Sequence, residues 1–594
     1  MARKNRIYPH VLPDIADWPI HRLLRDRRNF VENIAQFTFQ RLKKLYGAEW
    51  QDILARTIYL ERIRIKEEPW KVDPPNEKAF WKKMATRLMG PPAHRNGETA
   101  EEAAEQVLAI LIRRYSEEIV GTFNIHTFLF ARRFLTLFFN RLLNTAAGRN
   151  IKRVFGRRYK VNDRLLARGD IDTIRSLFTK GTVIMVPTHS SNLDSILIGY
   201  VLDTIVGLPS FSYGAGLNLY NTGYTAYFMN RLGAYRVDRR KKNPIYLENL
   251  KAMSNLSIQR GTNSLFFPGG TRSRSGSLEN KLKMGLLGTA VEAQRAIFQQ
   301  NRTDKVFIVP LVLSYHVVLE AKYLVEQHLQ QTGKERYIRS KDDFYSLRKI
   351  LKFGWNFFSQ PSEITLSFGK PMDVLGNFVD GEGNSLDQFG RTVDLRDYFR
   401  STDRDITENL QRESQYTIML AERIADRYRR ENIVLTSHVV AFAAFKMLQR
   451  TNSGLDLFGI LRLPPDDLLL PIHAMLQLTA QLVSALQSLE ANGELKLAPA
   501  LSDDTERIVR DGIRKLGVYH VAKPLIFNKK GDITSQDLKL LFFYHNRLDA
   551  YPLDRFIDWQ AIQALPADDL PNPSPVGVLL DADTENAGAN HFVG

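Results

Sequence analysis

One histidine and one aspartate in the chain are spaced for proton transfer. The segment VPTHSSNLDS places His189 ahead of Asp194, with four residues between them. A carboxylate that accepts a hydrogen bond from one imidazole nitrogen fixes the tautomer and leaves the other nitrogen to take a proton from an alcohol. This arrangement predicts general-base catalysis without a covalent enzyme intermediate.

Spacing alone does not identify this pair, because the chain has 12 histidines and the same spacing recurs at His21 and Asp26. The second pair lies in a charged helical stretch with no strand before it. His189 instead follows the apolar run Thr182–Pro187, and Asn192 is predicted to cap the helix that comes next. We interpret the first pair as catalytic and the second as a chance match.

A loop rich in glycine and arginine, LFFPGGTRSRSG, follows a second apolar run. Glycines let backbone N–H groups approach an anion, and two guanidinium groups can bind phosphate oxygens. The loop lacks the Gly-Lys-Ser/Thr ending of a Walker A motif. A basic hairpin in solvent is the alternative. The loop residues predicted to bind substrate are Gly270, Thr271, Arg272, Ser273 and Arg274.

The charge of the chain points to anionic partners. The net charge is +17, and the run RLGAYRVDRRKK at 231–242 holds six basic residues and one acid. Taken alone, this run is better interpreted as a solvated charged surface. The chain has no cysteine, which excludes disulfides and thiol nucleophiles. No nucleic-acid recognition motif is present, so we predict a phosphorylated substrate or an anionic membrane surface as the partner.

The elements around these motifs predict an α/β fold with a central, mostly parallel sheet, flanked by N-terminal and C-terminal helical regions. Short apolar runs at 182–187, 264–268, 306–313 and 364–369 alternate with helical stretches. The predicted domains are 1–150 (helical), 151–400 (α/β), 401–562 (helical) and 563–594 (disordered tail). No internal repeat is evident, and we expect neither a signal peptide nor a transmembrane helix.

The run Phe123–Asn144 alternates bulky apolar clusters with Arg132, Arg133 and Arg141. Such a basic amphipathic helix suits an anionic bilayer surface. A core helix whose arginines reach out to solvent is the alternative. We predict possible membrane contact for the N-terminal region.

Four segments, in this order, resemble the motif blocks of the glycerolipid acyltransferase superfamily. They are HSSNLD (189–194), GAYRVDR (233–239), FPGGTRS (267–273) and IVPLVLSY (308–315). The runs RSRSG, KMG, GLNL, SYHVVLE and LLFFYHNRL are similar to the bacterial glycerol-3-phosphate acyltransferase branch. One residue departs from the pattern, because Gly269 stands where the superfamily has glutamate.

The resemblance implies an acyltransferase that moves a fatty acyl group from acyl-CoA or acyl-acyl carrier protein to the sn-1 hydroxyl of glycerol 3-phosphate. In this interpretation His189 is the base, Asp194 orients it, and Arg239 and Lys283 join the loop arginines in holding the phosphate. It implies no metal, no cofactor beyond the acyl donor, and a peripheral location on the cytoplasmic face of the cell membrane. The oligomeric state stays open. The alternatives are a 1-acylglycerol-3-phosphate acyltransferase and a catalytically inactive membrane-binding homologue.

Overall fold

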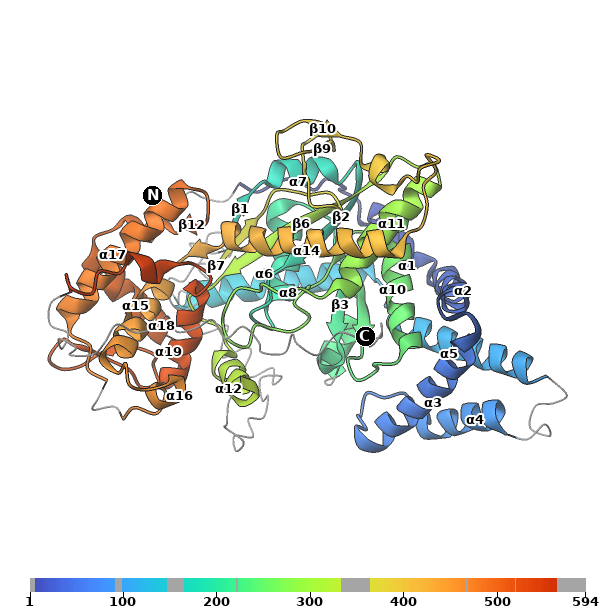
Figure 1. The fold of residues 1–594 in the computed structure, drawn as a ribbon, viewed down its shortest axis with the longest axis horizontal. Helices are drawn as coiled ribbons and strands as arrows, with labels where there is room; N and C mark the ends of the chain where they lie inside the picture. The colour runs from blue at the N-terminus through green and yellow to red at the C-terminus, as the bar shows by residue number, and fades with distance from the viewer. Residues whose placement is uncertain are drawn as a thin grey trace.

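The central element of the molecule is a seven-stranded sheet (Figure 1). The computed structural model describes residues 6–90, 99–146, 165–220, 223–332, 364–464, 468–518 and 520–562. The strands lie in the order β1-β7-β6-β2-β5-β3-β4. Strands β6, β2, β5, β3 and β4 are parallel, whereas β7 pairs antiparallel with β6, and β1 runs with β7. The predicted α/β class with a mostly parallel sheet is therefore confirmed.

Some of the strands match the predicted apolar runs and others do not. Their bounds are β1 (Leu165–Gly169), β2 (Gly181–Pro187), β3 (Ser212–Gly216), β4 (Ala234–Val237), β5 (Ser264–Leu265), β6 (Lys305–Ser314) and β7 (Ile364–Phe368). Strands β2, β6 and β7 match the apolar runs closely. Strand β5 is shorter than predicted, and β1, β3 and β4 were not predicted at all.

Both faces of the sheet are buried, as continuous apolar strands require. Along β2, the side chains of Val183 and Met185 join one hydrophobic core, while those of Ile184 and Val186 join another. The first face is covered by α7 (Ile171–Leu177) and α8 (Asp194–Val201). The second is covered by α10 (Pro244–Gln259), α11 (Met284–Gln299) and α14 (Leu410–Glu431), and Figure 1 shows α14 crossing the sheet. The sheet is thus a rigid base for residues at the strand ends.

The N-terminal part of the chain is helical, with α1 (Pro19–Arg25), α2 (Arg27–Tyr46), α3 (Trp50–Glu67), α4 (Glu77–Met89), α5 (Ala100–Ile119) and α6 (Ile125–Ala146). Figure 1 shows α2 to α5 at one side of the sheet, whereas α6 lies behind it, where Thr136 contacts Tyr200 of α8. Helices α2, α3, α4 and α5 share a hydrophobic core with α10. Within the described part of the chain, no helix combines the length and hydrophobicity needed to cross a membrane.

The C-terminal helices lie at the opposite end of the sheet (Figure 1). They are α15 (Thr436–Thr451), α16 (Leu457–Ile460), α17 (Ile472–Ala491), α18 (Thr505–Gly517) and α19 (Leu538–His545), with the strand pairs β11 (Ile433–Val434) with β12 (Lys496–Leu497) and β13 (Ile526–Phe527) with β14 (Ile533–Thr534). Helix α14, which lies within the predicted C-terminal helical region of 401–562, packs on the sheet together with α11. The predicted tail, 563–594, lies outside the described residues.

A seven-residue repeat follows β7, so the expectation of no internal repeat is wrong. Asp373, Asp380 and Asp387 each accept backbone N–H groups from the residues two and four positions later. A glycine with positive φ completes each turn. The repeat forms a small sheet of β8 (Phe378–Val379), β9 (Ser385–Leu386) and β10 (Thr392–Val393). The period is carried by the turn residues Asp and Gly and by one apolar position per turn, at Val379, Leu386 and Val393.

Candidate active site

The predicted pair comes together at the carboxyl end of β2. The turn after β2 carries His189, and Asp194 opens α8. The Asp194 side chain folds back over this turn, where its Oδ2 atom accepts the backbone N–H groups of Ser190 (2.7 Å) and Ser191 (2.9 Å). Asn192, expected to cap the helix, precedes its first turn and makes no side-chain cap, so that prediction is wrong. The aspartate at the start of the helix uses its own carboxylate to close the turn.

The geometry of His189 suits a general base. Its Nδ1 lies 2.9 Å from Asp194 Oδ2, and Tyr315 donates its hydroxyl to Asp194 Oδ1. Because an ionised carboxylate accepts only, Nδ1 carries the proton and Nε2 keeps its lone pair. The His189 ring stacks on Phe267 at 4.0 Å between ring centroids. Asp194 is fully buried, whereas the His189 side chain is 16% exposed, so only the histidine can meet a substrate.

The glycine- and arginine-rich loop lies against His189. It leaves the end of β5, and the backbone N–H of Ser273 donates to the His189 carbonyl oxygen at 2.7 Å. Gly270 has φ 77°, and its N–H donates to the carbonyl of Phe267 at 2.9 Å. This amide closes a turn in the loop, so an oxyanion role for it would require the turn to open. His189 and the loop are thus joined by a backbone hydrogen bond.

The basic residues predicted to bind phosphate are not equivalent. The Arg272 side chain is 13% exposed, and its Nη1 lies 3.5 Å from Glu320. Arg274 donates to Gln331, and the Lys283 side chain lies over Gly270. Thr271 and Ser273 lie in the same loop, and the Ser273 hydroxyl donates to the Ser277 carbonyl. Arg239 is exposed beyond the end of β4, two strands away from β5.

The rest of the basic run at 231–242 is structural. Arg240 forms ion pairs with Asp73 and Asp238, and buried Lys241 pairs with Glu118. These contacts attach the loop after β4 to the N-terminal helices. The interpretation of this run as solvated is therefore wrong for Arg240 and Lys241. In the second His-x4-Asp match the two side chains have other partners. His21 contacts the carbonyl of Ala16, and Asp26 accepts a hydrogen bond from Asn29.

Several site residues were missed by sequence reasoning. The Oε1 atom of Glu279 accepts the backbone N–H of His189 at 2.9 Å. Glu320, which is fully buried, accepts from the Ser191 hydroxyl (3.0 Å) and the Asn192 N–H (3.1 Å). No local sequence signal marked Glu279, because it contacts His189 from 90 residues away in sequence.

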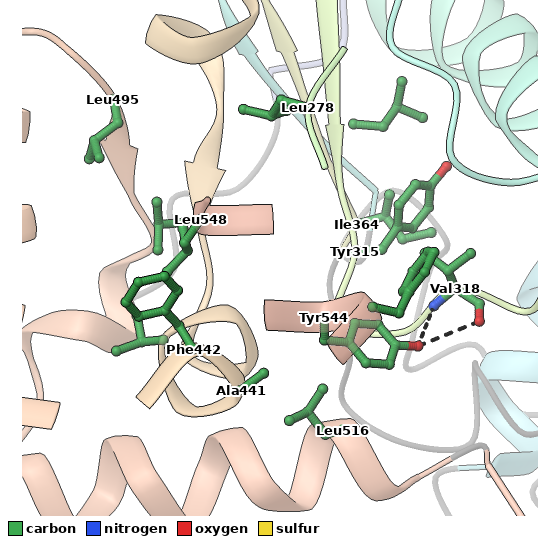
Figure 2. Close-up of a cluster of buried hydrophobic side chains, with 14 of the residues drawn as sticks. Leu278, Tyr315, Val318, Ile364, Ala441, Phe442, Leu495, Leu516, Tyr544 and Leu548 are labelled. Carbon is green, nitrogen blue, oxygen red and sulfur yellow. Dashed lines mark hydrogen bonds between the residues drawn. The ribbon is translucent and has the colours of Figure 1, made fainter. Parts of the chain in front are cut away.

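The C-terminal unit braces this site through α19 and the residues after it. Figure 2 shows the Tyr544 hydroxyl, which accepts the Val318 N–H at 3.0 Å, just after β6. The Asn546 amide donates to the Ser275 carbonyl in the glycine- and arginine-rich loop at 2.9 Å. Buried Arg547 donates to the carbonyl of Leu313 in β6 at 2.8 Å. The segment LLFFYHNRL thus holds two walls of the site from a distance of more than 200 residues in sequence.

Comparison with known proteins agrees with this architecture. The acyltransferase family matches residues 168–314, which include β2, the turn that carries His189, the loop after β5 and β6. Residues 168–314 are therefore an acyltransferase domain.

Within that family, the chain is similar to proteins named glycerol-3-phosphate acyltransferase, and the predicted resemblance is confirmed. One, from Pseudoalteromonas atlantica, is 32% identical over 214 residues, which are 36% of this chain and 24% of the relative. Another, from Pseudomonas fluorescens strain Pf-5, is 26% identical over 366 residues, which are 61% of this chain and 37% of the relative. The chain thus matches well under half the length of these curated relatives.

Proposed function

We propose that this chain transfers a fatty acyl group from a thioester donor, acyl-CoA or acyl-acyl carrier protein, to the sn-1 hydroxyl of glycerol 3-phosphate. The observation that carries the proposal is the His189–Asp194 pair, whose turn is hydrogen-bonded to the loop that carries Arg272 and Arg274. The names of the similar proteins support glycerol 3-phosphate as the acceptor.

The chemistry balances without a covalent enzyme intermediate. His189 Nε2 takes the proton of the acceptor hydroxyl as its oxygen attacks the thioester carbonyl carbon. The buried Asp194 carboxylate stabilises the imidazolium that forms. The tetrahedral intermediate collapses with cleavage of the C–S bond, and His189 returns the proton to the departing sulfur. The products are the acyl ester and the free thiol of the donor.

The test is thiol release from palmitoyl-CoA by the purified full chain in mixed micelles, with glycerol 3-phosphate, lysophosphatidate or no acceptor. We expect release that depends on glycerol 3-phosphate and falls by at least about 10²-fold in His189→Ala. His21→Ala is the matched control, because His21 has the same spacing to an aspartate, and we expect it to keep wild-type activity. Release with lysophosphatidate alone would reassign the acceptor. Equal rates in His189→Ala and wild type would refute the proposed base.

Phosphate binding by the loop has its own test. We expect Arg272→Ala to raise KM for glycerol 3-phosphate with a smaller effect on kcat, because the guanidinium would contact the acceptor and not the reacting atoms. Arg239→Ala reports whether the exposed arginine at the sheet edge takes part. An unchanged KM in Arg272→Ala would exclude this arginine from the phosphate site.

We further propose that α6 contacts an anionic membrane surface. Phe130, Phe134 and Leu137 are 58%, 51% and 57% exposed on one face of this helix, next to exposed Arg133. A face of this kind binds bilayers through apolar burial and attraction to anionic lipids. We expect Phe134→Glu to reduce sedimentation with phosphatidylglycerol vesicles several-fold. Phe389→Glu, at a position on the β9–β10 turn that is 72% exposed, should not.

A further inference from the structure

The carboxyl group of Glu279 lies inside the active site, directly behind His189. Its Oε1 accepts the His189 backbone N–H, while its buried Oε2 has no hydrogen-bond partner among the described residues. Burial raises the pKa of this carboxyl to about 8, although the His189 N–H opposes the shift; the nearby Asp194 adds to it. The neutral acid is thus the main form at neutral pH. A carboxyl group that is this poorly compensated costs stability, so its presence points to a role in the site.

The space that Glu279 occupies is the space of a side chain at residue 269. A Cβ atom on Gly269 would lie 2.8 Å from Glu279 Cδ and 2.9 and 3.0 Å from its two oxygens. These three atoms are its nearest neighbours. The φ angle of Gly269 is not in the left-handed region, so its backbone accepts an L-residue. The obstacle to a side chain at this position is therefore the Glu279 carboxyl group itself.

We propose that Glu279 is a positioning residue for the base: it holds the His189 backbone from a downstream segment, and glycine at 269 makes room for it. The proposal rests on the proposed acyl transfer by His189. It also accounts for the departure at 269, where related motifs carry glutamate. The carboxyl group has been relocated to residue 279, and its absence from 269 is not the mark of an inactive protein.

Two substitutions at 279 separate a positioning role from simple packing. Glu279→Gln keeps an oxygen that accepts the His189 N–H and resembles the neutral carboxyl in shape. Glu279→Ala removes the acceptor and leaves this N–H without its partner. Since small displacements of a catalytic group can cost about 10²-fold, we expect Glu279→Ala to lower kcat by roughly 10- to 100-fold. Glu279→Gln should stay within about threefold of wild type, and KM for glycerol 3-phosphate should change little in both.

A double-mutant cycle tests the contact between the two positions. We expect Gly269→Ala to lower kcat in the wild-type background, because its methyl group displaces the Glu279 carboxyl. In the Glu279→Ala background the same change should cost nothing further, since the obstructing atoms are gone. The melting temperature should show the same pattern, with a loss of roughly 1–4 °C in the first background only.

The outcomes distinguish this inference from the proposed function. Equal costs of Gly269→Ala in both backgrounds, or a wild-type kcat in Glu279→Ala, would overturn the positioning role while leaving acyl transfer intact. A Glu279→Gln variant as impaired as Glu279→Ala would overturn it too. If the wild-type chain transfers no acyl group to any acceptor, the proposed function fails, and the melting-temperature cycle alone decides whether Glu279 holds this loop.

Discussion

The buried carboxylate of Asp194 permits a test that separates its charge from its geometry. Its Oδ2 accepts from His189 Nδ1 and from two backbone N–H groups, while its Oδ1 accepts from the Tyr315 hydroxyl. In Asp194→Asn, the amide oxygen must take the Oδ2 position, because backbone N–H groups cannot reverse. The new NH₂ group then faces Tyr315, whose hydroxyl can rotate to accept. The variant should therefore keep the histidine tautomer and lose only the negative charge.

The size of the loss follows from the His189–Asp194 contact. Charges about 4 Å apart interact by about 4 kcal/mol at an effective dielectric constant of about 20. Because the imidazolium is only partly formed in the transition state, we expect a loss of about 2–4 kcal/mol, or roughly 30- to 10³-fold in kcat. Asp194→Ala instead leaves the N–H groups of Ser190 and Ser191 without acceptors, at about 1–3 kcal/mol of stability each.

The assay pairs thiol-release kinetics with thermal unfolding for both variants. Asp194→Asn should fall in kcat while its melting temperature stays within a few degrees of wild type. Asp194→Ala should lose both activity and stability. Wild-type kcat in Asp194→Asn would show that the carboxylate charge is not used. A melting temperature as low as that of Asp194→Ala would refute the hydrogen-bond geometry on which the argument rests.

Further predictions concern the surroundings of the pair. Asn546→Ala removes the hydrogen bond to the Ser275 carbonyl, so KM for glycerol 3-phosphate should rise several-fold; an unchanged KM would show that the loop keeps its shape unaided. Tyr315→Phe removes a hydroxyl donor from the Asp194 carboxylate and should cost about 1.5–3 kcal/mol of stability by denaturant unfolding. In the folded chain the pKa of Glu279 is raised to about 8, whereas in the unfolded chain the group loses its proton above about pH 4.5. The stability of the wild type therefore falls as pH rises between these two values. The free energy of unfolding of Glu279→Gln should therefore gain on that of wild type as pH rises through this window, by about 1 kcal/mol per pH unit, and the gap should close below pH 5. A gap that does not vary with pH would contradict the raised pKa.

The sequence predicted those elements whose residues carry a local signal. Strands β2 and β6 match the predicted runs and α14 lies within the predicted helical region of 401–562, because each has a continuous apolar stretch or a regular apolar face. Strand β3, with the sequence SYGAG, has no such signal. It is a strand because β5 and β4 pair with it on either side, and this depends on tertiary structure.

The same distinction applies to the site. His189 and Asp194 were predictable because the strand, the turn and the helix that join them are contiguous in sequence. The contacts of Glu279 with His189 and of Asn546 with Ser275 depend on how the chain returns to the site. A single sequence gives the residue types but not this proximity. The basic run after β4 illustrates the opposite error. Its charged neighbours predicted that Lys241 would be exposed to solvent, but the side chain is buried in an ion pair with Glu118.

The buried acids of the site also bear on how it receives an anion. Glu279 and Glu320 flank the catalytic turn, and two ionised carboxylates there would repel a phosphate ester. Burial raises the pKa of both groups, to about 8 for Glu279, while the Arg272 charge opposes the shift at Glu320. The proton that Glu279 keeps removes one negative charge from behind the base. Protonation of Glu320 would in turn leave the Arg272 charge to an incoming phosphate, since Glu320 would no longer neutralise it. If the acceptor is the phosphate ester proposed above, the site can hold two carboxyl groups beside His189, provided that burial keeps them from both being ionised.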